Sequence, residues 1–166
     1  MTAVPILIAD AVAAEINTAG DGEVIDTFGM VAKRTYADWD DCFEDLSDGG
    51  AALDVVFRSA GKISLNSFGS LLHEPSIHVA IRKRFEPSDR EDDGRLKQSS
   101  VDPLVSLLEE IYEHFATRRN SVSLPGETNA TWEGEDSVIR SVDQAKLRQG
   151  LFEGYVEIRF QYDKEV

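Results

Sequence analysis

The three histidines of this 166-residue chain lie too far apart in the sequence to form a familiar metal-binding motif. His73, His78 and His114 show neither an HxxxH nor an HExxH spacing, either of which would place two imidazoles on one face of a helix. We therefore expect them to be ordinary surface or strand-packing residues. The pattern predicts no metal site and no cofactor.

The acidic segment 38–48 is the second group with possible ligands. It carries six carboxylates and no basic residue, namely Asp38, Asp40, Asp41, Glu44, Asp45 and Asp48. Calcium prefers such oxygen ligands, but Cys42 stands where a third oxygen ligand is needed, and no glutamate ends a twelve-residue loop. We interpret the segment as the solvated face of a short helix that ends at Gly49 and Gly50.

Two side chains could in principle act as nucleophiles. Cys42 lies among carboxylates, which raise the pKa of a thiol and suppress the thiolate, so we expect a half-buried apolar filler. Ser70 and His73 occur together in "SFGSLLHE", but no third partner accompanies them. The sequence contains no GxSxG motif and no phosphate-binding glycine loop. We expect a protein that is not an enzyme.

Composition favours a single soluble domain over residues 1–166, since 42% of the residues are apolar and 29% are charged. The 17 basic and 31 acidic side chains give a net charge of −14, which the phosphates of DNA would repel. Such a chain can surround DNA without gripping it. A single cysteine excludes an internal disulfide. The opening stretch resembles neither a signal peptide nor a membrane span, so we expect synthesis in the cytoplasm and no membrane partner.

Periodicity predicts two main helices and five strands. The helices are expected over 5–18 and from Asp102, which would cap a first turn that begins at Pro103. The strands are expected over 23–36, 52–59, 76–82, 131–142 and 152–162, with long loops at about 59–72 and 86–100 and a further loop over 123–130. This order, α-β-β-β-α-β-β, predicts an α+β fold whose mostly antiparallel sheet carries helices on one face.

The predicted core is the set of apolar residues that share one face of each element. It comprises Ile8, Val12, Ile16, Leu53, Val55, Leu104, Leu108, Ile111, Phe115, Val156, Ile158 and Phe160.

A dense charged stretch follows the third strand. The basic triplet Arg82, Lys83 and Arg84 ends the strand, and the next residues mix both signs. Because these residues end a strand and have little apolar surface to bury, we expect them to be largely solvated and to form a docking surface. The candidates are Arg82, Lys83, Arg84, Glu86, Asp89, Arg90, Glu91, Asp92, Asp93 and Arg95. The alternative is a flexible, solvated loop.

Four stretches together resemble the tail-terminator, or tail-completion, proteins of long-tailed bacteriophages and related head–tail joining proteins. They are "PILIADAVAAEINTA", "VAKRTYADWDD", "IRKRFEPSDREDDGRLKQSSVDPLVSLLEEIYEHF" and "GLFEGYVEIRFQYDKEV". The resemblance covers nearly the whole chain and is closest over Val79–Phe115. It is one of sequence texture and element order, with no catalytic motif.

The resemblance implies a virion protein that forms a ring, typically of six subunits, at the head end of the tail tube. Its partners would be copies of itself, the tail tube protein and a head–tail connector or stopper protein. DNA would pass through the lumen without specific binding. We expect Asp38, Asp40, Asp41, Glu44 and Asp45 to face that lumen.

Two other readings stay open. The chain is alternatively a connector, a stopper or a tail-tube subunit. A further alternative, unrelated to phage, is a small soluble ligand-binding protein or an enzyme. A ring of about 110 kDa, six subunits of 18.4 kDa, would favour the phage readings, and a monomer that binds a metabolite would favour the other.

Overall fold

The structure is a computed structural model that describes residues 2–21, 25–36, 43–118, 121–126, 128–140 and 143–164. In chain order the elements are α1 (Val4–Asp21), β1 (Ala32–Arg34), β2 (Ala51–Leu65), β3 (Leu71–Arg84), the 3₁₀ turn η1 (Pro87–Asp89), α2 (Gln98–Glu113), the π-helical turn η2 (His114–Arg118), β4 (Ser121–Leu124), β5 (Thr128–Arg140), α3 (Gln144–Arg148) and β6 (Leu151–Lys164).

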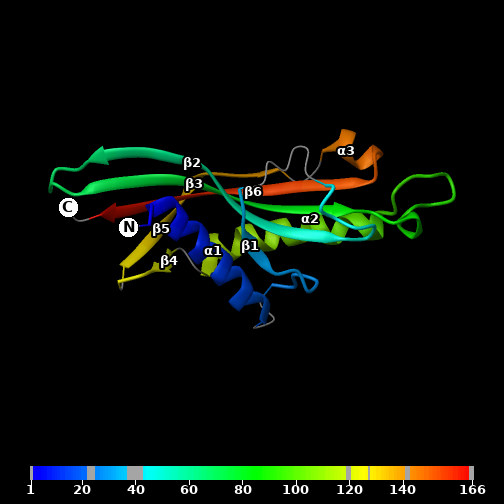
Figure 1. The fold of residues 1–166 in the computed structure, drawn as a ribbon, viewed down its shortest axis with the longest axis horizontal. Coiled ribbons are helices and arrows are strands. Elements are labelled where there is room, and N and C mark those ends of the chain that lie inside the picture. The colour runs from blue at the N-terminus through cyan, green and yellow to red at the C-terminus, as the bar shows by residue number, and fades with distance from the viewer. Residues whose placement is uncertain are drawn as a thin grey trace.

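In the described part of the chain the strands form one sheet in the order β1-β2-β3-β6-β5-β4. Every neighbouring pair is antiparallel except β1 and β2, which run parallel. Strands β2, β3 and β6 run along the long axis of the molecule, with α1 and α2 on one side of them (Figure 1). The fold is therefore α+β with a mostly antiparallel sheet, as the sequence predicts.

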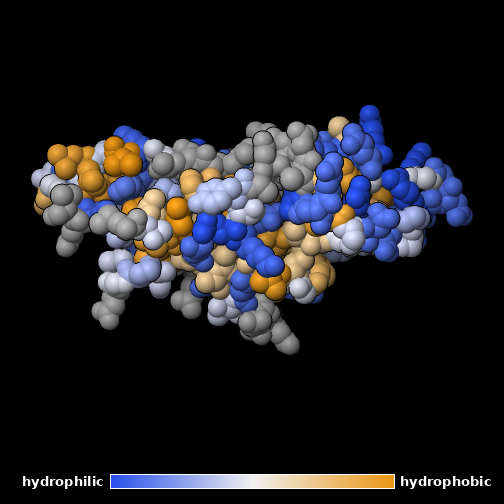
Figure 2. All heavy atoms as spheres, viewed as in Figure 1, coloured by the Kyte–Doolittle hydropathy of each residue, from blue (hydrophilic) through white to orange (hydrophobic). Residues whose placement is uncertain are grey.

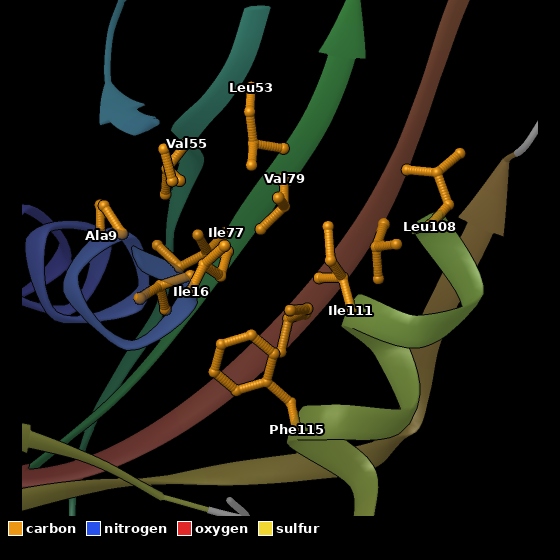
Figure 3. Close-up of a cluster of buried hydrophobic side chains, with 14 of the residues drawn as sticks. Ala9, Ile16, Leu53, Val55, Ile77, Val79, Leu108, Ile111 and Phe115 are labelled. Carbon is orange, nitrogen blue, oxygen red and sulfur yellow. The ribbon is translucent and has the colours of Figure 1, made fainter. Parts of the chain in front are cut away.

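The core lies between the sheet and the helices α1 and α2. Side chains from β2 and β3 point toward Ile16 of α1, toward Leu108 and Ile111 of α2 and toward Phe115 of η2 (Figure 3). All twelve predicted core residues are buried. The prediction succeeds because a strand exposes alternate residues to each face and a helix repeats its buried stripe every three or four residues.

Helix α1 also holds the short edge strand β1. The amide of Asn17 donates to the carbonyl oxygen of Ala32 at 3.0 Å, and its oxygen accepts from the Ala32 amide at 2.7 Å. Arg34 binds the carboxylate of Asp10 at 2.6 Å. Of the described residues in the predicted strand 23–36, three form a strand, because Thr27–Met30 forms a turn in which the Met30 amide donates to the Thr27 carbonyl oxygen.

Helix α2 begins at Gln98, earlier than predicted, and Pro103 lies inside it. The charged loop, residues 85–97, explains this extra turn of helix. The hydroxyl of Ser100 donates to Asp89 at 2.8 Å, and the Lys97 amide donates to the Asp89 carbonyl oxygen. These contacts fix the backbone ahead of Pro103, so the Asp102 cap predicted from sequence is wrong.

The segments predicted as loops at about 59–72 and over 123–130 are largely extended. Strands β2 and β3 continue to Leu65 and from Leu71, and they join at a tight turn over Asn66–Ser70. Strands β4 and β5 form a second hairpin. Glycine, serine and polar residues hid both hairpins, although Val122, Leu124 and Ala130 of the second hairpin are buried in the core.

The described end of the acidic segment, residues 43–50, is a series of turns where a helix was predicted. Phe43 and Leu46 are buried, and the segment lies against the end of β3 through a hydrogen bond from the Gly49 amide to the Arg84 carbonyl oxygen. Contacts with the sheet replace the hydrogen bonds of a helix there. Cys42 lies outside the described residues.

Candidate assembly surfaces

Arg82, the first member of the basic triplet, is buried, with only 2% of its surface exposed. Its Nε donates to Asp54 Oδ2 at 2.5 Å, and its two terminal nitrogens bind both oxygens of Asp45 at 2.9 and 3.1 Å. A planar guanidinium satisfied on both sides by carboxylates ties β3 to β2 and to the 43–50 segment. The expectation that Arg82 is solvated is wrong.

The Arg82 network shifts the ionisation of its members. The hydrogen bond from Arg82 lowers the pKa of Asp45, and the charge of Arg82 acts in the same direction. Burial alone would lower the pKa of the Arg82 guanidinium, but its hydrogen bonds to Asp45 and Asp54 outweigh burial and raise it. Both charges therefore persist through the physiological pH range, and the network is a structural fastening.

Lys83 and Arg84 reach further into solvent than Arg82. Arg84 donates to the Leu46 carbonyl oxygen at 3.1 Å and lies 3.8 Å from Asp48. The ammonium of Lys83 lies 5.5 Å from the centre of the Phe85 ring. Both side chains are half-buried and remain candidates for contact with a partner.

The charged loop is ordered by its own hydrogen bonds. The Glu91 amide donates to the Arg95 carbonyl oxygen at 2.7 Å, and Arg90 Nη1 donates to the Gly94 carbonyl oxygen at 2.7 Å. Arg90 and Leu96 form an isolated bridge. At the root of the loop, the Glu86 amide donates to Asp89 at 2.8 Å. These bonds give the loop a defined backbone conformation.

Most of the predicted interface residues in this loop are exposed. Glu86, Glu91, Asp92, Asp93 and Arg95 are exposed, whereas Asp89 and Arg90 are half-buried. The loop projects at one end of the long axis, beyond α2 and near α3 (Figure 1). It thus presents carboxylates and Arg95 to solvent on a backbone of fixed shape.

The predicted lumen-facing acidic set divides into three parts. Asp38, Asp40 and Asp41 lie outside the described residues. Glu44 is exposed. Asp45 is committed to Arg82, so its charge is balanced within the subunit.

The face of the sheet opposite the core is polar and partly covered, which the sequence analysis missed. Asp54, His78, Arg82 and Glu153 are all buried there. His78 stacks on Tyr155 at 4.7 Å and lies 3.6 Å from Glu157, and Lys146 of α3 forms an ion pair with Glu153. The signal in the sequence was the alternation along β3, in which even-numbered positions such as His78 and Arg82 are polar. That face was expected to be solvated.

The turn between β2 and β3 exposes large apolar side chains. We call residues 63–72 the arm tip. Phe68 is 94% exposed, Leu65 71% and Ile63 53%, although the chain buries most of its other large apolar residues. Asn66 accepts hydrogen bonds from the Phe68 and Ser70 amides, and its amide donates to Asp163 at 2.8 Å, so the turn has a fixed shape. Figure 2 shows hydrophobic residues gathered at this end of the molecule.

A second surface with exposed apolar side chains lies beside β1. We call it the β1 groove, an open hollow of about 470 Å³. Its lining residues are Phe28, Gly29, Met30, Val31, Lys33, Gly49, Ala51, Ala52, Leu53 and Asp54. Phe28 and Val31 are 54% and 59% exposed. The groove therefore combines exposed apolar side chains with the charged residues Lys33 and Asp54.

A third hollow, of about 710 Å³, lies between the charged loop, the start of α2 and α3. Three arginines, Arg90, Arg95 and Arg148, line it together with Asp93 and Asp102. The mixed charges resemble a surface for a charged partner. In the described part of the chain, no three His, Cys, Asp or Glu residues are grouped closely enough to hold a metal ion.

No protein-family model matches the sequence, and comparison with the curated proteins also gave no match. None of the helices among the described residues is both long and apolar enough to cross a membrane.

Proposed function

We propose that the chain is a structural subunit of a virion, a tail terminator that forms a ring over the head end of a tail tube. The support from the sequence is its resemblance to that family over nearly the whole chain. The structure adds a rigid, elongated subunit with separate apolar and charged surfaces (Figures 1 and 2). Such a subunit is suited to contacts with several proteins at once.

The observation that carries the proposal is the arm tip. Apolar side chains that are more than half exposed and gathered at one place commonly mark a protein contact. The hydrogen bonds to Asn66 hold the turn in one shape with Phe68 outward. Binding at the tip therefore costs little of the conformational entropy that ordering a loop would cost. A partner protein that covers the tip is the simplest account of its exposure.

The charge of the chain fits passage of DNA through a ring. With −14 per subunit, a ring repels duplex phosphates on average and avoids the counterion release that would hold the genome in place. Asp45 contributes little to this field because Arg82 neutralises it. The exposed carboxylates Glu91, Asp92 and Asp93 and the acidic segment supply the repulsion instead.

A connector, a stopper or a tail-tube subunit would use the same surfaces, so these alternatives differ from the proposal in place and not in kind. One observation favours a different class. The hollow has three arginines, Arg90, Arg95 and Arg148, against two carboxylates, Asp93 and Asp102, a small excess of positive charge that favours a small anionic ligand. A calorimetric titration with phosphate and with short acidic peptides tests that second candidate.

Deletion of the gene from the phage genome that carries it tests the proposed function. Without a cap the tube end stays open to further subunits, so we expect tails of irregular length and heads without tails in electron micrographs. The normal gene supplied in trans should restore complete particles. Complete, infectious particles in its absence would contradict the proposal, and uniform tails that leak DNA would favour a stopper.

A further inference from the structure

We propose that β4 of one copy pairs edge to edge with the outer edge of β2 in the arm tip of the next copy, so that one sheet continues across the subunit boundary. The inference deepens the proposed function by naming the strands of the ring contact. It rests on that function only for the closed form of the assembly. The contact itself follows from the two edges of the sheet in a single chain.

The outer edge of β2 is uncovered where the strand enters the arm tip. On that side the described residues supply β1 as the only strand neighbour, and β1 pairs with β2 over Leu53–Val55. From Ile63 to Asn66 the edge carries no charged residue and no proline, and the nearest charge on the strand is Lys62. Proteins commonly use charges and prolines to protect an edge strand from other chains. This edge is therefore open to another strand.

The hydrogen bonds of the turn indicate which backbone groups of this edge face outward. The Asn66 amide donates to the Ser70 carbonyl oxygen at 3.0 Å, so the backbone of Asn66 faces β3. Backbone groups of successive residues in a strand point to opposite sides, so those of Ile63 and Leu65 point away from β3. The same two residues are 53% and 71% exposed. They therefore offer free backbone groups together with apolar side chains to a partner strand.

Strand β4 provides the second free edge of the sheet. It is the last strand in the described part of the chain, and it pairs with β5 on one side. Its four residues, Ser121–Leu124, also include no charge and no proline. Val122 and Leu124 are 2% and 6% exposed and hold the strand against the core, while Ser123 is exposed. The second edge is thus fixed in place and uncharged, like the first.

The two edges lie on opposite sides of the same end of the molecule. In Figure 1, β2 forms the upper border at the end that carries the arm tip, and β4 lies at the lower border of that end. Within one chain, β3, β6 and β5 separate β2 from β4 in the sheet. A copy stacked on the upper border brings its β4 toward β2 of the first copy, so pairing of the two edges joins two molecules.

A second copy is the occupant that the charges and the edges favour. Two chains of −14 repel each other over most of their surfaces, so a contact is least unfavourable where both sides lack charge. Residues 63–66 and 121–124 both meet this condition. One contact between copies also covers both free edges at once, which removes the hazard of uncontrolled strand pairing. Because the two edges are different surfaces, the contact is head-to-tail and propagates to a ring or a filament.

Hydrogen exchange of single backbone amides tests the pairing directly. The wild type is measured over a range of concentrations that spans its association. We expect the outward amides of Ile63 and Leu65 to exchange at least about tenfold more slowly in the assembly than in the monomer, because each then donates to a partner strand. The Phe68 amide is the control, since it is bonded to Asn66 in every copy. Assembled protein in which Ile63 and Leu65 gain no protection overturns the proposal.

A pair of variants at Leu65 separates backbone pairing from a side-chain contact. Leu65→Pro removes an amide that faces away from β3, so the β2–β3 hairpin loses no hydrogen bond of its own. Leu65→Thr removes the same apolar side chain but retains the amide and suits a strand. We expect association to be at least about tenfold weaker for Leu65→Pro than for Leu65→Thr. Slow exchange of the Ser64 amide, which faces β3, shows that the hairpin is intact, and equal association of the two folded variants overturns the proposal.

Cysteine trapping tests the identity of the second strand. Ser123→Cys is combined in turn with Ile63→Cys, Ser64→Cys and Leu65→Cys in a Cys42→Ser background, because Cys42 is the only natural cysteine. Under mild oxidation we expect at least one combination to give a ladder of covalent oligomers, and each single-cysteine variant to give at most a dimer. If no combination passes the dimer at a protein concentration where the wild type associates, β4 is not the partner strand and the proposal is overturned.

The outcomes separate this inference from the proposed function. Wild-type oligomers in which the β2 edge stays unprotected overturn the inference and leave the virion ring standing, with that edge free for a different protein. Oligomers held by this edge in a protein that is dispensable for particles overturn the function and leave the contact standing. A wild-type chain that stays monomeric and yields no trapped oligomers overturns the contact.

Discussion

At the scale of single residues, Arg82 has the largest structural role among the charged side chains. It was selected from sequence as a surface residue because it ends a strand in a basic triplet. Two contacts show that Arg82 is not a surface residue. Asp54 of β2 binds its Nε, and the 43–50 segment brings Asp45 over its terminal nitrogens. Neither contact could be found from local spacing, since the partners are 28 and 37 residues away.

We predict that Arg82→Met destabilises the protein by about 3–5 kcal/mol, because it leaves the buried carboxylate of Asp54 without its partner. The double variant Arg82→Met, Asp54→Leu should recover much of that loss, since neither charge of the buried Arg82–Asp54 pair then remains. Urea unfolding of the two variants measures both values. Lys83→Met serves as the control on the adjacent, half-buried lysine. Equal stabilities for all three variants would show that the network is dispensable.

The Asp45–Arg82 contact also predicts a dependence on pH. The folded-state pKa of Asp45 lies below its usual value, so the contribution of the contact is complete above about pH 4 and is lost as the pH falls through the folded pKa. The stability difference between wild type and Asp45→Asn should therefore be constant near neutral pH and shrink in acid. Glu44→Gln, which removes an exposed charge nearby, should show no such trend in thermal melts.

At the scale of elements, the sequence predicts well wherever one face of an element is buried. Helix α2 and strand β6 repeat their apolar residues with the right period, and every core residue predicted from them is buried. The end of the β2–β3 hairpin beyond the core, which we call the arm, was missed for the opposite reason. Its strands extend past the core, and the glycines and serines at 59–61 and 67–70 made the segment resemble a loop, although residues 62–66 alternate polar and apolar side chains.

We predict that Leu108→Ala costs about 2–5 kcal/mol, because the side chain is fully buried between α2 and the sheet and its removal leaves a cavity. Leu65→Ala removes a leucine that is 71% exposed and should change the free energy of unfolding by far less. Chemical denaturation of both variants gives the comparison. A small effect at Leu108 would place the core elsewhere.

The bulge in the arm depends on Gly61. This residue has a φ of 67°, and a Cβ atom there would overlap the carbonyl oxygen of Glu74 on β3. Gly61→Ala should therefore open the β2–β3 pairing, with faster amide exchange over the arm and a loss of at least about 1 kcal/mol. Gly69→Ala is the control, because its φ of 82° imposes a similar backbone strain with open space around the new methyl group. Equal exchange rates in the two variants would refute the role of the overlap.

At the scale of the whole molecule, the subunit separates its surfaces by chemistry. The arm tip at one end is apolar, and the charged loop at the other end carries both signs (Figure 2). The sequence alone indicated the charged end, because a run of acidic and basic residues is visible without a structure. The apolar end required the structure, since only the fold shows that Phe68 lies in a turn and not in the core.

A ring of this protein is expected to repel DNA. The charge of −14 per subunit predicts no shift of a duplex in a gel assay at low salt, where any attraction through Lys83 or Arg84 would be strongest. The same assay with a basic protein of similar mass provides the positive control. A stable complex with the duplex would contradict a lumen through which a genome passes freely.

The central claim is that the chain assembles head to tail into a closed ring, and native mass spectrometry of the purified protein over a range of concentrations tests it most directly. We predict one dominant assembly near 110 kDa, six chains of 18.4 kDa, whose mass does not grow as the concentration rises. Closure explains the fixed mass, because in a closed ring the last subunit contacts the first and no free surface remains for another chain. A mass of 18.4 kDa at every concentration, or a series that lengthens without limit, would contradict the account.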